Sequence, residues 1–168
     1  MFLGLATLAL VAGCGSPSER AAAESPVDTA PILKRQARDD LDRYDKAFAA
    51  AQGGKVVVTP PSWDPFNAPL GLSIDSATAA PDGMRLTAAF TGAKENATVP
   101  CGMDYSAEAV EGANAVVVIV KSRPYAENQI CTLVGYPRTA PVALARPLGE
   151  RAVLEVMQGL PVPVKTAS

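Results

Sequence analysis

The sequence contains no histidine. Histidine is the most frequent general base, activates Ser and Cys nucleophiles and binds zinc, so its absence excludes catalytic triads, His-paired thiols and metal sites built on His. The motifs of nucleotide-binding loops, serine hydrolases and dithiol redox sites are missing as well. We therefore expect no cofactor, no metal site and no catalytic residue, and a protein that is not an enzyme.

The chain is also poor in aromatic residues and has no excess of basic charge. Aromatic residues make up 5 % of it, and 17 acidic side chains outnumber 15 basic ones. The resulting net charge of -2 argues against a nucleic-acid partner bound through a broad basic surface. The 168 residues are 48 % hydrophobic, which is enough for one well-buried domain and too little for two domains of ordinary size.

The N-terminal segment has the features of an export signal. Residues 2–12 form an almost uninterrupted apolar run, which is shorter than the roughly 20 residues that a membrane-spanning helix needs. Residues 11–14, Val-Ala-Gly-Cys, are similar to the lipobox at which lipoprotein signal peptides are cleaved. The alternative is a plain secretory signal in which Cys14 is incidental. Signal peptides normally open with Lys or Arg, and no charged residue precedes Cys14, so we expect translation to start upstream of Met1.

This pattern predicts three parts of the chain. Residues 1–13 are expected to be a signal peptide, residues 14–31 a flexible tether rich in Ser, Pro, Ala and Glu, and residues 32–168 a single domain. In lipoproteins with this motif the cysteine carries a diacylglyceryl group. Two acyl chains anchor a protein stably, so Cys14 would hold the domain on the extracytoplasmic face of the membrane.

Apolar periodicity predicts one helix followed by strands. Between residues 32 and 51, apolar side chains recur every three or four residues and include Leu33, Leu41 and Phe48, and Gly53 and Gly54 follow. Beyond Gly54 the apolar period falls to two, with turns at Pro and Gly. We expect strands at residues 55–59, 70–75, 84–91, 103–109, 115–120, 129–135, 139–145 and 151–156.

The strand pattern predicts a mainly β fold, an immunoglobulin-like or related β-sandwich with one N-terminal amphipathic helix, with a barrel as the alternative. Residues 115–120 are apolar in both phases, so this strand is expected to be central and covered on both faces, one of them by the helix. In the strand before it, Met103, Tyr105, Ala107 and Ala109 form the row that faces inward.

Cys101 and Cys131 remain as an even pair in an exported chain, which predicts a disulfide. The expected strand directions place both cysteines at the same end of the fold. A redox or catalytic thiol is the alternative, but the chain has neither a Cys-x-x-Cys motif nor a histidine to support it.

Two sets of side chains are candidates for function. Trp, Tyr and Arg dominate binding hot spots, and three predicted loops place them beside prolines. Their alternative role is packing at the core or at turns. Carboxylates could also converge into a catalytic pair, although most carboxylates are simply solvated. The loop candidates are Trp63, Phe66, Arg123, Tyr125, Tyr136 and Arg138, and the carboxylates are Asp64, Asp75, Asp104, Glu108 and Glu155.

The lipobox, the Ala-rich tether, the Arg-Tyr-Asp-Lys-Ala segment at 43–47 and the run from Cys131 to residue 162 resemble small secreted actinobacterial lipoproteins. The resemblance implies a membrane-anchored lipoprotein and carries over no catalytic residue. We expect a non-enzymatic binding module for an envelope protein or a cell-wall component. The alternatives are a carboxylate-based hydrolase of cell-wall glycans that works without histidine, and a structural spacer of the envelope.

Overall fold

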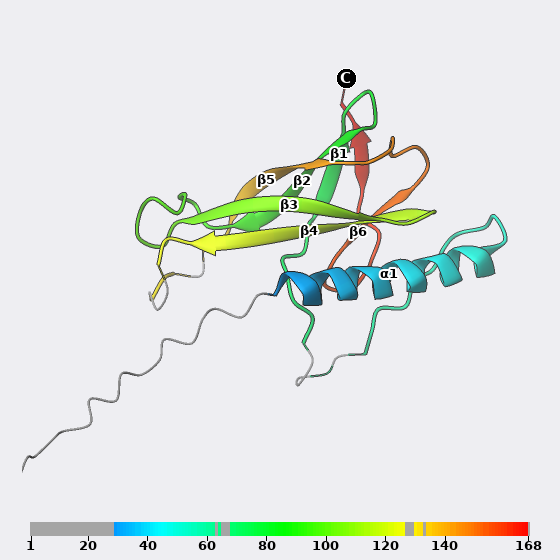
Figure 1. Cartoon of the computed structure of the whole chain (residues 1–168), viewed down its shortest axis with the longest axis horizontal. Coiled ribbons are helices and arrows are strands. Elements are labelled where there is room, and N and C mark those ends of the chain that lie inside the picture. The colour runs from blue at the N-terminus through cyan, green and yellow to red at the C-terminus, as the bar shows by residue number, and fades with distance from the viewer. Residues whose placement is uncertain (1–28, 63, 65–67, 127–129, 133, 168) are drawn as a thin grey trace, which may run out of the picture.

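The computed structural model describes residues 29–62, 64, 68–126, 130–132 and 134–167. The expected signal peptide, Cys14, Trp63 and Phe66 lie outside these residues. One helix, α1 (Ala30–Ala51), precedes seven strands (Figure 1). The strands are β1 (Ser76–Ala79), β2 (Arg85–Gly92), β3 (Met103–Glu111), β4 (Ala115–Pro124), β5 (Tyr136–Ala143), β6 (Ala152–Glu155) and β7 (Val164–Thr166).

The strands form two mixed sheets. The four-stranded sheet has the order β5-β2-β1-β7, and the three-stranded sheet has the order β3-β4-β6. The β1·β7 and β4·β6 pairs are parallel, and the other pairs are antiparallel. The fold is therefore mainly β with one helix, as the sequence predicts.

Strand β4 is central, and its two faces belong to two different cores. Val116, Val118 and Val120 face the four-stranded sheet and pack in one cluster with β1, β2 and β5. Ala115, Val117 and Ile119 point the other way, into a second cluster with α1. Figure 1 shows the resulting layers, with α1 on the outer side of the three-stranded sheet. The predicted central position of this apolar strand is confirmed, including its cover by the helix.

The helix begins two residues earlier than predicted and ends at Ala51, the predicted residue. It begins at Ala30, so Ala30 and Pro31 of the expected tether belong to it. Proline is tolerated in the first helical turn because the backbone N–H it lacks has no helical partner there. At the other end Gln52 already has a φ of 46°, and Gly53 follows with 85°. Phe48, which the apolar spacing assigns to the buried face, is 46 % exposed and stacks on Tyr44. The spacing of apolar residues shows which face of a helix is apolar, but not how far along the helix the sheet covers it.

Three predicted strands are wrong in whole or in part. Residues 55–59 form no strand, although Val56 and Val58 pack against the core beneath α1, which explains their alternation. The described residues of 129–135 are also irregular. In the segment 70–75 only Leu72 pairs, in an isolated bridge to Val120, and the strand itself starts at Ser76.

Strand β7 was not predicted, because all three of its residues are exposed and no alternation marks it. No helix within the described ranges is long and apolar enough to cross a membrane.

Candidate ligand-binding site

Cys101 and Cys131 form a disulfide, with their Cα atoms 5.6 Å apart. The bond ties the β2–β3 loop to the segment between β4 and β5, at the end of the fold where the sequence placed both cysteines. We call residues 93–102, 124–126, 130–132 and 134–135 the disulfide end. The predicted pairing is confirmed, and a disulfide fits an oxidising, extracytoplasmic compartment.

The β2–β3 loop is held by its own backbone. Met103 donates its N–H to the Glu95 carbonyl at 2.8 Å, and Gly102 donates to the Val99 carbonyl at 2.9 Å. A Cβ atom at Gly102 would lie 1.8 Å from the Asn96 carbonyl oxygen, so only glycine fits there. The loop therefore presents Cys101 from a compact turn.

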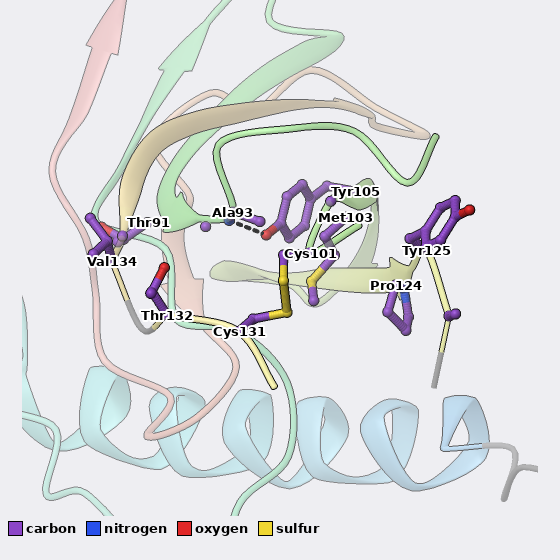
Figure 2. Close-up of a pocket in the computed structure, with 14 residues that line it drawn as sticks. Thr91, Ala93, Cys101, Met103, Tyr105, Pro124, Tyr125, Cys131, Thr132 and Val134 are labelled. Atoms are coloured by element: carbon purple, nitrogen blue, oxygen red, sulfur yellow. Dashed lines mark hydrogen bonds between the residues drawn. A yellow bond between two sulfur atoms is a disulfide. The ribbon is translucent and has the colours of Figure 1, made fainter. Parts of the chain in front are cut away.

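A cavity of about 650 Å³ lies at the disulfide end (Figure 2). It falls within the 300–1,000 Å³ range of typical small-molecule sites. Most of its lining residues are exposed, so it opens to solvent. None of the described residues that line it is charged, and the set is Thr91, Gly92, Ala93, Cys101, Gly102, Met103, Tyr105, Pro124, Tyr125, Ala126, Cys131, Thr132, Val134 and Gly135.

Tyr105 links this cavity to the core. Its ring meets the buried Phe90 edge-on at 4.9 Å between centroids, and its hydroxyl accepts the Ala93 N–H at 2.6 Å. A Cβ atom at Gly92 would lie 2.5 Å from the Tyr105 hydroxyl oxygen. The close approach of the ring therefore depends on a residue without a side chain at position 92.

The predicted loop placement is wrong for three of the four candidates that lie in described residues: Arg123 belongs to β4, and Tyr136 and Arg138 belong to β5. The strands extend this far because their backbones stay paired, Arg123 opposite Asp104 and Arg138 opposite Phe90, which side-chain patterns do not report.

Both arginines bind residues at or next to the disulfide end. Arg138 lies 5.6 Å from the Tyr105 ring centroid and donates to the Lys94 carbonyl at 2.8 Å and to Asn96 Oδ1 at 3.0 Å. Arg123 pairs with Asp104 at 2.5 Å. The Ala97 N–H and, after it, the Arg123 guanidinium lower the pKa of Asp104 below its ordinary value.

The two tyrosines from the predicted loops lie at the same end. Tyr125 lines the cavity, and Tyr136 lines a smaller hollow of about 180 Å³ that shares Cys101, Thr132 and Val134 with it. The sequence did not single out Thr132 or Val134, which stand in a stretch that was predicted as a strand.

None of the five candidate carboxylates is among the described residues that line the cavity. Glu108 binds Lys121 at 2.9 Å and Lys34 at 3.6 Å, and the Lys121 hydrogen bond lowers the pKa of Glu108. Glu155 accepts the N–H groups of Met157 and Gln158, both at 2.8 Å. Asp64, Asp75 and Asp104 are likewise absent from the cavity lining, and the part of the chain that is described holds no metal-ligand cluster.

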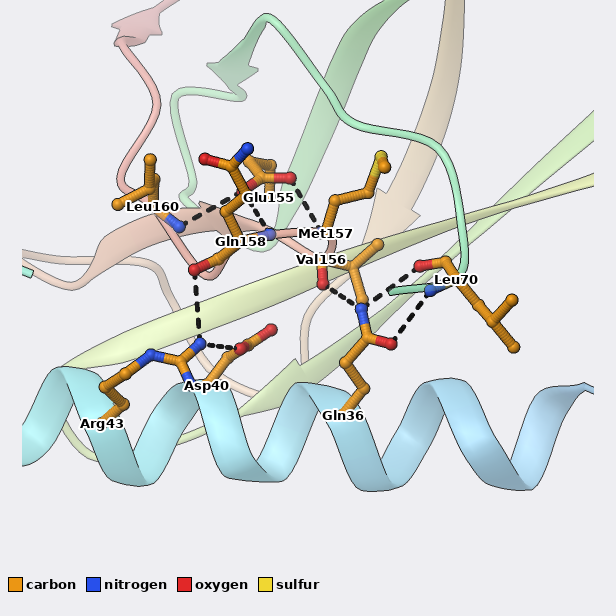
Figure 3. A network of polar contacts seen from close by, with 9 residues as sticks. All are labelled: Gln36, Asp40, Arg43, Leu70, Glu155, Val156, Met157, Gln158 and Leu160. Atoms are coloured by element: carbon orange, nitrogen blue, oxygen red, sulfur yellow. Dashed lines mark hydrogen bonds and ion pairs between the residues drawn. The ribbon is translucent and has the colours of Figure 1, made fainter. Parts of the chain in front are cut away.

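A second polar cluster fastens α1 to the chain that follows β6 (Figure 3). Gln36 donates to the carbonyls of Val156 and Leu70, and its side-chain oxygen accepts the Leu70 N–H at 3.1 Å. Arg43 contacts Asp40 and donates to the Gln158 carbonyl at 3.2 Å. These bonds cross from the helix to two other segments, which gives the cluster a structural role.

Asp40 is the most perturbed acid in this cluster. It is 3 % exposed, and its Oδ2 atom has no hydrogen-bond partner among the described residues. Burial raises the pKa of Asp40 to about 6, against the opposing effect of the Arg43 charge. Gly159 lies so close that a Cβ atom there would approach the Asp40 carboxylate to 2.8 Å.

Comparisons of the chain with known protein families, with curated proteins and with solved structures found no match.

Proposed function

We propose that the protein is a lipid-anchored, extracytoplasmic binding module that uses the cavity at the disulfide end as its ligand site. Cys14 carries the anchor, residues 15–28 separate it from the domain, and the domain is a β-sandwich of the immunoglobulin-like or a related type. The observation that carries the binding role is an open cavity of about 650 Å³ whose described lining has no charged side chain.

The lining determines what class of ligand fits. Met103, Pro124 and Val134 offer apolar surface, and Tyr105 and Tyr125 offer aromatic rings. The Tyr105 hydroxyl already accepts a backbone hydrogen bond, so it has less capacity for a polar ligand. Burial of apolar surface is therefore the main source of affinity, at about 25 cal/mol per Å².

The placement of the candidate loop residues supports the same site. Arg138 binds the β2–β3 loop directly, and Arg123 binds Asp104, which accepts the Ala97 N–H of that loop. Tyr125 contributes to the cavity wall. The hydrolase and the envelope spacer stay predictions that no observation favours over binding. A glycan hydrolase needs two carboxyl groups across a cleft, and the described lining of this cavity contains none.

The test is a titration of the full-length protein with N-phenylnaphthylamine, a neutral dye that fluoresces in apolar surroundings. Thr132→Phe places a ring in the cavity wall, and we expect it to weaken dye binding about tenfold, equivalent to ~1.4 kcal/mol. Thr139→Phe is the matched control, because Thr139 is exposed on β5 and does not line the cavity. Equal dye binding by both variants would contradict the proposed site.

A further inference from the structure

We infer that the occupant of the cavity is an acyl chain of a phospholipid from the bilayer to which the protein is anchored. This inference rests on the proposed function and adds the ligand class and the orientation of the domain. Three independent features of the disulfide end carry it.

The first feature is the position of the helix start. Thr29 and Leu33 line a small hollow together with Val120, Lys121 and Ser122 of β4. Ser122 precedes the cavity residue Pro124 by two positions on the same strand. Figure 1 likewise shows the start of α1 toward the same end as the arrowhead of β4. The described chain therefore begins at the same end of β4 as the cavity.

The length of the connection to Cys14 limits how far the cavity can lie from the membrane. Residues 15–28 separate Cys14 from the described chain, and they span at most about 50 Å when fully extended. An anchored domain thus has its disulfide end within reach of the bilayer surface.

The second feature is exposed apolar surface at and next to the disulfide end, which includes the cavity residues Tyr125 and Val134. Five of the ten large hydrophobic side chains that are exposed in the described residues belong to the loops of this end or to the first residue of β5. Exposed apolar groups gathered in one region indicate an interaction surface, whereas scattered ones need no explanation. The five are Val99, Tyr125, Ile130, Val134 and Tyr136.

The third feature is the separation of charge from apolar surface. Lys94 and Arg123 are exposed and stand next to the cavity residues Ala93 and Pro124 in the chain, whereas the described lining itself carries no charge. Glu95 forms an ion pair with Lys94, and Asp104 forms one with Arg123. The surface next to the cavity is therefore polar, and these four charges cancel. An apolar interior beside paired charges matches an amphiphile with an acyl chain and a zwitterionic headgroup.

The experiment places the lipid-modified full-length protein in phosphatidylcholine vesicles that contain a phospholipid with a diazirine on its acyl chain. After illumination, the labelled peptides are mapped by mass spectrometry. We expect label on residues 95–138, which include both cysteines and most of the cavity lining. The label is carried only by bilayer lipids, so an acyl chain on Cys14 cannot produce it.

Two matched variants test whether the label reports the cavity. Ala126→Phe adds a ring at a lining position, and we expect it to lower the label on residues 95–138 about tenfold. Ala143→Phe adds the same ring at an exposed position of β5 outside the cavity and should leave the label unchanged. Phospholipids with shorter acyl chains should label less, by about fourfold for each buried methylene lost.

The outcomes separate this inference from the proposed function. If the naphthylamine dye binds the cavity but the acyl label stays off residues 95–138, the lipid is the wrong occupant and the binding module stands. Label confined to residues 15–28, or a second copy of the chain that covers the cavity and excludes label, would also overturn the inference. If neither dye nor label enters the cavity, both proposals fail.

Discussion

Asp40 should make the protein more stable in mild acid than at neutral pH. The folded protein holds the proton on this carboxyl more tightly than the unfolded chain, since burial raises its pKa from 3.8 to about 6. Between these two values the native state binds more protons, so the free energy of unfolding falls as the pH rises. The difference corresponds to about 3 kcal/mol, because each pH unit is worth ~1.4 kcal/mol.

The perturbation that isolates this effect is Asp40→Asn, which keeps the shape of the side chain and removes its titration. Three neighbouring charges also affect the pKa of Asp40: Arg43 of the same helix lowers it, whereas Glu155 of β6 and the adjacent Asp39 raise it. We expect wild-type stability to fall by up to about 3 kcal/mol between pH 4 and pH 7 and the variant to lose most of this slope. Asp39→Asn changes an exposed carboxyl on the same helix and should keep the wild-type slope.

Urea unfolding followed by circular dichroism at several pH values measures these free energies directly. Asp104 and Glu108 act in the opposite direction, because their lowered pKa values make stability fall as the pH drops through the acidic range below that of Asp40. A wild-type stability that rises between pH 4 and pH 7, or an unchanged slope in Asp40→Asn, would refute the reasoning.

Three further changes test the disulfide end, each by chemical denaturation. Replacing both Cys101 and Cys131 by Ser removes a disulfide between residues 30 positions apart, and we expect the free energy of unfolding to fall by about 3.5 kcal/mol in the chain-entropy model. A loss of less than ~1 kcal/mol would contradict this expectation. Gly102→Ala should cost about 3 kcal/mol, because its Cβ would meet the Asn96 carbonyl, and unchanged stability would show that the loop yields. Tyr105→Phe leaves the Ala93 N–H without its acceptor and should cost about 1 kcal/mol, whereas no loss would mean that water replaces the hydroxyl.

The elements that the sequence predicts well are those with a strong local pattern. Residues 115–120 are apolar in both phases, and only a strand covered on both faces can bury them all, which is where β4 lies. The turn between β1 and β2 falls at Pro and Gly residues, where the sequence predicts turns. Gly83 has a φ of 68°, and Asp82 accepts the Met84 N–H at 2.9 Å.

The prediction was wrong where side-chain burial and backbone strand pairing do not coincide. Val56 and Val58 both pack against the core beneath the helix, whereas Val57 between them is exposed. A strand produces the same alternation of buried and exposed residues, so the pattern predicted a strand in a segment that is irregular. The exposed β7 carries no periodic signal and pairs with β1 through its backbone, which side-chain patterns do not report.

The cavity could be predicted only in part. Alternation correctly placed Tyr105, Ala107 and Ala109 on the inner face of β3, where they pack against the core between the sheets. Met103 belongs to the same row but is not part of that core; it lines the cavity, as Tyr105 also does. Which residues of a row border a cavity is a property of the tertiary fold, and a one-dimensional pattern does not contain it.

The central claim is that apolar ligands enter the cavity at the disulfide end, and methionine methyl NMR tests it most directly. Three of the four methionines lie in described residues: Met103 lines the cavity, whereas Met84 precedes β2 and Met157 packs beneath α1. When full-length protein with labelled methionine methyl groups is titrated with N-phenylnaphthylamine, we expect the Met103 signal to shift while those of Met84 and Met157 stay in place. A Met103 signal that does not move at saturating dye, or equal shifts of all three signals, would contradict the account.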